Sequence, residues 1–219
     1  MISRVTRSKS EAARNYNRLS RWYDTLSGSS EKKYRDLGLQ LLDAQPGEHI
    51  LEIGYGTGQC LVALAKAVGP GGKVCGIDIS EGMHSVATKR LQQAKVEGWV
   101  DLRVGDAAQL PFEPGSFDAV FMSFTLELFD TPEIPLVLAQ CRQVLRPGGR
   151  IGLVVMVLPE RPGLAVRIYE WFHTRWPVAV DCRPILARQA LQDTGFFIEK
   201  ADRLSMWGLP VDVILARLG

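Results

Sequence analysis

The sequence predicts an α/β fold in which helices cover both faces of a mostly parallel sheet. Short apolar runs alternate along the middle of the chain with stretches of helical periodicity, and glycine or proline groups separate them. The connections are short, which is typical of successive strand–helix–strand units. Phe117 to Ser123 (FDAVFMS) is almost continuously apolar, as expected for a strand that is buried on both faces.

The expected core elements follow one another without an internal repeat. Strands are expected at residues 49–53, 73–77, 100–104, 117–123 and 150–158. Helices are expected at residues 60–67, from Ser80 and Glu81 to about 97, and at 132–144. Glycine and proline groups end the first helix at residues 69–72 and turn the chain at residues 146–149.

The C-terminal part departs from this alternation. Residues 159 to about 192 have a helical pattern that several prolines interrupt. Residues 196–203 and 211–218 then form two consecutive strands, joined by a loop that contains glycine and proline. Because no helix separates these strands, we expect an antiparallel hairpin at the edge of the sheet.

Composition bounds the partners of the chain. With 26 Lys and Arg against 24 Asp and Glu in 219 residues, the formal charge of +2 does not by itself indicate nucleic-acid binding. The first 21 residues are locally basic, with Arg4, Arg7, Lys9, Arg14, Arg18 and Arg21 against the single acid Glu11. Such an arm either contacts an anionic membrane surface or is a solvated terminus.

The cysteines favour a reducing compartment. Cys60, Cys75, Cys141 and Cys182 form no CxxC pair and have no metal-ligand spacing, so we expect buried free thiols and no metal site. No apolar run approaches the ~20 residues that a bilayer span requires. A cytoplasmic protein is therefore expected.

The strongest chemical signal is a glycine loop between the first strand and the first helix, Glu52-Ile53-Gly54-Tyr55-Gly56-Thr57-Gly58. Glycines let the chain turn sharply and let a ligand approach the backbone. The spacing differs from the dinucleotide pattern G-x-G-x-x-G, because Gln59 stands where the third glycine belongs. Glu52 is unsuited to a pyrophosphate and suits a cationic ligand. A purely structural tight turn is the alternative.

Two carboxylates follow the next two strands. Asp78 ends the second strand, where it can accept hydrogen bonds from ribose hydroxyls; a helix cap is the alternative, although Ser80 already fills that position. Asp106 follows the third strand and can accept an adenine amino group while the Ala107 amide meets a ring nitrogen. A turn-forming role is the alternative for Asp106. Together with the glycine loop, the two acids favour an adenosine joined to a cationic amino acid.

These runs carry a family resemblance. ILEIGYGTG, GIDIS, GDAAQLPFEPGSFDAVFMSFTLELF and LRPGGRI resemble class I S-adenosylmethionine (SAM)-dependent methyltransferases, especially the ubiquinone/menaquinone biosynthesis C-methyltransferases. Residues 16–24 resemble the segment that precedes the core in that branch. The resemblance implies a Rossmann-like, doubly wound sheet of seven strands with the last antiparallel. It also implies SAM as the cofactor and S-adenosyl-L-homocysteine as its product.

The resemblance assigns roles to matching residues. The implied cofactor-binding residues are Tyr23, Glu52, Gly54, Gly56, Thr57, Gly58, Asp78, Ile79, Asp106, Ala107 and Ser123. Glu52 and the loop would hold the methionine part, Ser123 would line the methyl-donor pocket and Tyr23 would close over the cofactor. Two departures are the bulky Tyr55 inside the loop and the segment TLELF at 125–129, which lacks the histidine of many relatives.

The catalytic group is unknown from sequence. Methyl transfer is an in-line displacement, so a base is needed only if the acceptor must first lose a proton. His173 is the candidate, because Tyr169, Trp171, Phe172 and Trp176 can roof a pocket beside it. His49 and His84 are expected to be structural or solvated.

We expect a single methyltransferase domain in four parts: an N-terminal arm and cap helices at 1–45, a cofactor-binding core at 46–158, a helical insertion at 159–192 and a strand hairpin at 193–219. The insertion is either a lid that selects the substrate or a helix packed on the core.

The expected reaction is methyl transfer to a small, lipophilic acceptor such as a quinone precursor. The alternatives are a phospholipid or small-amine N-methyltransferase, a non-catalytic SAM-binding regulatory protein and an NAD-dependent oxidoreductase. No nucleic-acid partner is expected. Peripheral membrane contact through the basic arm or residues 159–183, and a homodimer, are left open.

Overall fold

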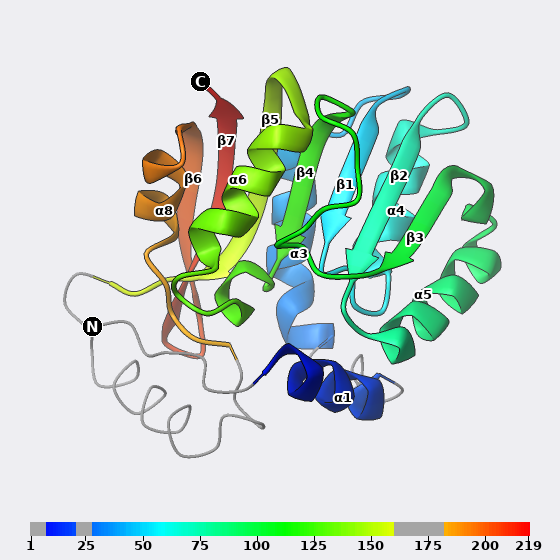
Figure 1. Cartoon of the computed structure of the whole chain (residues 1–219), viewed down its shortest axis with the longest axis horizontal. Helices are drawn as coiled ribbons and strands as arrows, with labels where there is room; N and C mark the ends of the chain where they lie inside the picture. The colour runs from blue at the N-terminus through cyan, green and yellow to red at the C-terminus, as the bar shows by residue number, and fades with distance from the viewer. Residues whose placement is uncertain (1–7, 21–27, 160–181) are drawn as a thin grey trace.

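The computed structural model describes residues 8–20, 28–159 and 182–219. Within these ranges a seven-stranded sheet has the order β3-β2-β1-β4-β5-β7-β6, as Figure 1 shows. The strands are β1 His49–Ile53, β2 Lys73–Asp78, β3 Val100–Val104, β4 Phe117–Ser123, β5 Leu145–Met156, β6 Phe196–Met206 and β7 Leu209–Leu218. Strands β1 to β5 pair in parallel and β7 runs antiparallel to both of its neighbours. The predicted mostly parallel seven-stranded sheet with an antiparallel C-terminal hairpin is confirmed, whereas most of the predicted helical insertion at 159–192 lies outside the described residues.

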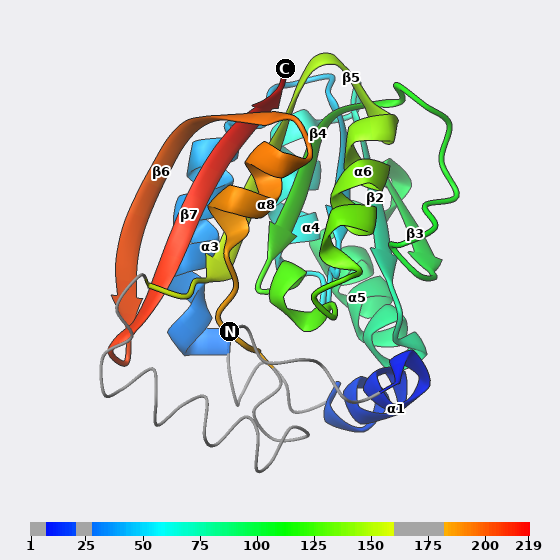
Figure 2. The ribbon, with the colours of Figure 1, turned by 60° about the vertical axis from the view of Figure 1, so that its left-hand side comes forward.

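Helices cover both faces of the sheet. They are α1 Lys9–Leu19, α3 Gly28–Leu42, α4 Gln59–Val68, α5 Glu81–Ala94, α6 Ile134–Val144 and α8 Ala187–Asp193, with short 3₁₀ turns at η1 Glu97–Trp99 and η2 Leu126–Leu128. Helices α6 and α8 pack on one face, and α3, α4 and α5 pack on the other. Figure 2 shows α8 beside the hairpin of β6 and β7.

The position of β4 between two helix layers explains its apolar sequence. Val120 and Met122 point into the core beneath α6, whereas Ala119 and Phe121 point into the core beneath α3 and α4. All four side chains have 0% exposure. Because successive side chains of a strand face opposite sides, a central strand between two helix layers has no polar face.

Several element boundaries differ from the sequence prediction, and two of the differences, at α5 and β5, have a clear structural reason. Helix α5 ends at Ala94, about one turn early, because Lys95 adopts a left-handed conformation with φ 57°. Strand β5 begins at Leu145, which pairs with Phe117, so residues 146–149 are an irregularity inside the strand and not a turn before it. Gly148, with φ 74°, permits that irregularity.

The C-terminal strands form the predicted hairpin. Residues of β6 and β7 pair from Phe196 with Leu218 to Met206 with Leu209, so both strands are longer than expected. The turn consists of Trp207 and Gly208, both with positive φ. β7 lies between β5 and β6, and β6 is the edge strand.

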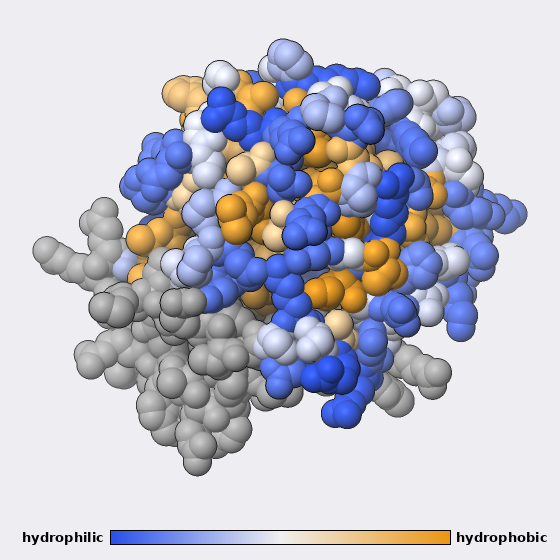
Figure 3. Space-filling model, viewed as in Figure 1, coloured by the Kyte–Doolittle hydropathy of each residue, from blue (hydrophilic) through white to orange (hydrophobic). Residues whose placement is uncertain are grey.

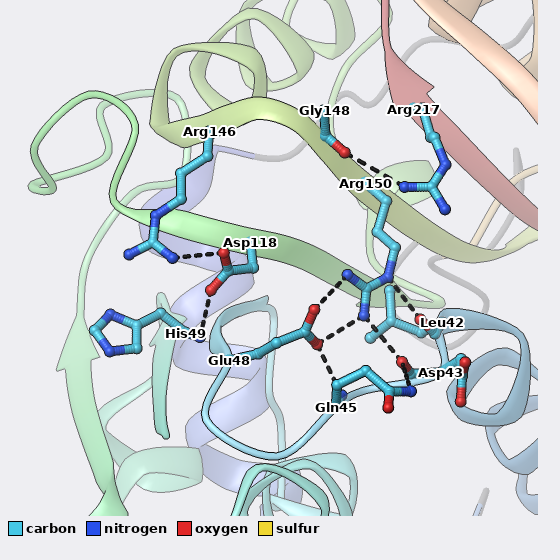
Figure 4. A network of polar contacts seen from close by, with 10 residues as sticks. All are labelled: Leu42, Asp43, Gln45, Glu48, His49, Asp118, Arg146, Gly148, Arg150 and Arg217. Carbon is cyan, nitrogen blue, oxygen red and sulfur yellow. Dashed lines mark hydrogen bonds and ion pairs between the residues drawn. The ribbon is translucent and has the colours of Figure 1, made fainter. Parts of the chain in front are cut away.

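Polar contacts tie together the amino ends of the parallel strands, as Figure 4 shows. The Arg150 guanidinium donates to both carboxylate oxygens of Glu48 at 2.7 Å and to the Leu42 carbonyl at 2.7 Å. The Asp118 carboxylate accepts a hydrogen bond from the His49 main chain at 2.8 Å. Burial raises the pKa of Glu48, but the Arg150 guanidinium and the Gln45 N–H together outweigh it and hold this pKa below its usual value. These contacts link β1, β4 and β5 to the end of α3.

All four cysteines are free, as predicted. Cys60, Cys75 and Cys141 are buried, whereas Cys182 is partly exposed. In the described part of the chain, no helix combines the length and apolar character needed to cross a membrane.

Candidate cofactor site

One cavity opens at the carboxyl edge of the sheet, and Figure 1 shows helix α1 lying across this edge. The strand ends bring the predicted residues together there. Those that line the cavity are Glu52, Gly54, Gly56, Thr57, Asp78, Ile79, Asp106, Ala107 and Ser123. They lie at or just after the carboxyl ends of β1, β2, β3 and β4, so the predicted shared edge is the one that the structure forms.

The glycine loop requires its first glycine for steric reasons. Gly54 has φ 69°, and a Cβ on it would lie 2.3 Å from Cγ2 of Thr125. Its main-chain N–H donates to the Ile77 carbonyl at 2.8 Å, which ties the loop to β2. No residue with a side chain fits this position without displacing Thr125.

Gly58 has a different role from the one expected. It does not line the cavity; it precedes α4 with φ 80°, and a Cβ on it would lie 2.9 Å from Cβ of Ala87 on α5. The third glycine of the loop therefore allows close packing of α4 against α5.

Asp78 organises the loop. Its carboxylate accepts hydrogen bonds from the main-chain N–H of Gly56 and of Ser80, each at 2.9 Å. Burial raises the pKa of Asp78 and the amide hydrogen bonds lower it, with a net rise. The cap of α5 is Ser80, whose side chain accepts from the Met83 N–H at 3.1 Å, so Asp78 is not the helix cap.

Glu52 is a buried acid at the wall of the cavity. It is 2% exposed, and its Oε2 has no hydrogen-bond partner among the described residues. Burial and the nearby charge of Asp78 raise the pKa of Glu52 well above its usual value, against a smaller lowering by Arg35. A buried carboxylate oxygen without a donor is costly, so the site fits a ligand that brings a cation or an N–H. The Ser123 hydroxyl oxygen is also buried without a described partner.

Asp106 is engaged by a residue that sequence analysis did not select. Its Oδ1 accepts from the Ala108 N–H at 2.9 Å, and its Oδ2 lies 2.6 Å from Nζ of Lys9. Lys9 also pairs with Glu133 at 2.6 Å. Lys9 lies 97 positions from Asp106, and no local pattern in the sequence joins them.

Helices α1 and α3 and the segment after β4 complete the cavity. Their lining residues, which sequence analysis did not assign, include Ser8, Ala12, Tyr16, Glu31, Arg35, Phe124, Thr125, Leu128, Phe129, Asp130 and Glu133. Phe124 has φ 52°, an uncommon backbone for an aromatic residue. Figure 3 shows apolar side chains directly above α1, among polar neighbours.

The bulk of Tyr55 is accommodated beside the second strand. A Cβ on Gly76 of β2 would lie 2.8 Å from Cδ1 of Tyr55, so the absence of a side chain at Gly76 makes room for the ring. The Tyr55 hydroxyl lies 3.2 Å from Nδ1 of His84. His84 is therefore a partner of Tyr55, in agreement with a structural role.

Two predicted residues cannot be placed. Tyr23 and His173 lie outside the described residues. His49 is at the opposite end of β1, and the described residues that line the cavity include no histidine.

Comparisons with known proteins agree with this geometry. A family described as a methyltransferase domain matches residues 50–149. The nocamycin O-methyltransferase of Saccharothrix syringae is 39% identical over 144 residues, which are 66% of this chain and 50% of that protein. The 2-phytyl-1,4-naphtoquinone methyltransferase of Synechococcus elongatus is 34% identical over 71% of this chain and 65% of that protein. The demethylmenaquinone methyltransferase of Bacillus subtilis is 30% identical over 73% of this chain and 66% of that protein.

The chain belongs to the class I SAM-dependent methyltransferases. The resemblance to the ubiquinone/menaquinone biosynthesis branch is confirmed. The matched region spans about half to two thirds of the length of these relatives.

Solved structures share the fold. A SAM-dependent methyltransferase from Aquifex aeolicus superimposes with a TM-score of 0.68 at 19% identity, over 93% of this chain and 98% of that one. The [4+2]-cyclase SpnF superimposes with a TM-score of 0.79 at 17% identity, over 99% of this chain and 98% of that one. Because a protein named as a cyclase shares this fold, the fold alone does not establish the reaction.

Proposed function

We propose that this chain transfers a methyl group from SAM to a small lipophilic acceptor of the quinone type. The observation that carries the proposal is the convergence of Glu52, Asp78 and Asp106 from three strand ends on one cavity. These acids suit a ligand with donors at three places and a positive charge near one end.

The residues fit the cofactor part by part. Glu52, with its buried and unpartnered Oε2, would accept from the ammonium of the methionine part. Asp78 already accepts from the main-chain N–H groups of Gly56, Ser80 and Ile79, but a carboxylate has about four lone-pair sites, so it retains an acceptor for a ribose hydroxyl. Asp106 would accept from the adenine amino group and Ala107 would donate to the ring.

SAM, when bound, supplies an activated methyl group on a sulfonium. The chain contributes position, since holding the acceptor in line with the transferred group can lower a barrier by roughly 7–11 kcal/mol. The acids at the cavity wall favour a cationic donor over its neutral product. Ser123 lines the cavity, and its hydroxyl oxygen is buried without a hydrogen-bond partner among the described residues.

Apolar side chains form part of the cavity wall. Tyr16, Phe124, Leu128 and Phe129 line the cavity from α1 and from the segment after β4. Aromatic and aliphatic side chains favour a flat apolar ring over a polar amine. Two of the relatives are named for methylation of naphthoquinone or menaquinone precursors, which supports the same acceptor class.

The test has two stages. Calorimetry with SAM and with S-adenosylhomocysteine measures cofactor binding. Methyl-labelled SAM is then incubated with a demethylated naphthoquinone, a small amine and phospholipid vesicles, and S-adenosylhomocysteine release is followed. Label on the naphthoquinone alone supports the proposal. Label on the amine or phospholipid favours N-methyl transfer, and binding without turnover on any acceptor favours a regulatory SAM-binding protein.

Partners and location are part of the proposal. Contact of the basic arm or of residues 159–183 with a membrane predicts sedimentation with anionic but not with zwitterionic vesicles. A homodimer predicts twice the chain mass in light scattering. A cytoplasmic location is supported by the four free cysteines.

A further inference from the structure

Lys9 occupies an unusual position in its helix. It is the first residue of α1, after the N-cap Ser8, which forms a capping box with Glu11. The amino end of a helix dipole is positive, so a cation there is unfavourable unless other groups hold it. Here the groups are Asp106 and Glu133, each 2.6 Å from the Lys9 ammonium.

Helix α1 is also attached through a residue other than Lys9. Near its other end, the Asn17 side chain accepts from the Ser80 hydroxyl at 2.7 Å and from the Gly82 N–H at 2.9 Å. A Cβ on Gly82 would lie 2.8 Å from Cα of Asn17, so the two backbones are in close contact. These contacts hold α1 in place independently of the two ion pairs of Lys9, which lie among the residues that line the cavity.

We propose that Lys9 and the group at position 6 of a bound purine compete for the same oxygen of Asp106, so that Lys9 sets the selectivity at this position. This inference rests on the proposed function. The Lys9 ammonium and a 6-amino group are both donors, so they repel each other when both approach Oδ2 of Asp106, whereas a 6-oxo group accepts a hydrogen bond from the ammonium.

Glu133 lowers the energetic cost of moving the Lys9 ammonium away from Asp106, because the ammonium keeps its contact with the Glu133 carboxylate. Burial lowers the pKa of Lys9, but the hydrogen bonds from Lys9 to Asp106 and Glu133 outweigh it, so the pKa is raised and the ammonium stays charged. The side chains of Lys9, Asp106 and Glu133 are 39%, 34% and 30% exposed, so solvent screens each pair and the effect is modest.

The test compares two ligands on matched variants. S-adenosylhomocysteine carries the 6-amino group, and S-inosylhomocysteine carries an oxygen in its place. For Lys9→Met we expect binding of S-adenosylhomocysteine to tighten about two- to fivefold and binding of S-inosylhomocysteine to weaken by a similar factor. Lys32→Met is the control, since Lys32 pairs with the exposed Asp36 on α3 and does not line the cavity. It should change neither constant.

Glu133→Gln supplies a second, opposite effect. Without this carboxylate the displaced ammonium has a poorer second acceptor, so S-adenosylhomocysteine should bind more weakly than to the wild type. Weakening of S-adenosylhomocysteine binding in Lys9→Met, no change, or shifts of both ligands in the same direction would overturn the inference. Absence of binding to the wild type itself would instead overturn the proposed cofactor, and the inference with it.

Discussion

The main-chain N–H of Gly56 donates a hydrogen bond to Oδ2 of Asp78 at 2.9 Å. The loop after β1 and the acid at the end of β2 are therefore one unit. Asp78, which the sequence pattern assigns to ligand binding, also holds the glycine loop in the shape that would surround the ligand. Substitution of Asp78 thus affects both folding and binding.

The first prediction concerns stability at this contact. Asp78→Ala leaves the amides of Gly56 and Ser80 without their acceptor. We expect the free energy of unfolding to fall by about 1–3 kcal/mol, because partly buried donors lose their partner. Urea denaturation followed by circular dichroism measures it. Asp78→Asn, which keeps one oxygen acceptor, should lose less, and an equal loss would argue against these hydrogen bonds.

The buried acid Glu52 should make stability depend on pH. Above the usual pKa of 4.5 the unfolded chain loses this proton while the folded protein, whose pKa is raised, retains it. The folded state then binds more protons, so its stability falls as the pH rises from that value through the raised pKa.

Glu52→Gln should remove this dependence. The variant is expected to be about 1–3 kcal/mol more stable than the wild type at about pH 8, and similar at about pH 4. It should bind SAM more weakly, because Gln cannot ionise opposite the ammonium of the bound ligand. Thermal unfolding at both pH values, with calorimetry, provides the measurement. Parallel pH profiles for the two proteins would show that Glu52 is ionised in the folded state.

Gly54 offers a test of the loop geometry. Gly54→Ala introduces a left-handed alanine and a contact of 2.3 Å with Thr125. Gly115 has a similar φ of 65° with nothing within 4 Å of a built Cβ, so Gly115→Ala reports the backbone effect alone. We expect Gly54→Ala to be about 1–3 kcal/mol more destabilising than Gly115→Ala. Equal losses in urea denaturation would mean that Thr125 moves freely.

Asn17 should hold the cap helix. Asn17→Ala removes the acceptor of the Ser80 hydroxyl and the Gly82 N–H, each worth about 0.5–1.5 kcal/mol. Hydrogen exchange of α1 amides should become at least several-fold faster, whereas amides of α4, which lies in the core, serve as the internal control. Unchanged exchange in α1 would show that other contacts hold this helix.

Local sequence patterns were sufficient to predict which segments form the strands of the sheet. Strands at His49–Ile53, Val100–Val104 and Phe117–Ser123 have the bounds that the sequence predicts. The burial of β4 follows from its nearly continuous apolar sequence, whereas β3, with the sequence VDLRV, is at most partly buried. The predicted end of α5 was wrong because Lys95 adopts a positive φ, which the residue type does not indicate.

The walls of the cavity were less predictable. Glu52, Asp78 and Asp106 follow strands, so the parallel topology alone gathers them at one edge. Lys9 and Arg35 reach the cavity from helices that precede the sheet, and their positions depend on tertiary contacts. The left-handed Phe124 likewise follows from packing of the segment after β4.

The most direct test of the account is a calorimetric titration of SAM into the wild type, Asp78→Ala and Asp36→Ala. We expect one site in the wild type, an affinity weaker by about 1.5–3 kcal/mol in Asp78→Ala and no change in Asp36→Ala, whose exposed acid is outside the cavity. A wild type that does not bind SAM, or an Asp78→Ala variant that binds it equally well, would contradict the proposed site.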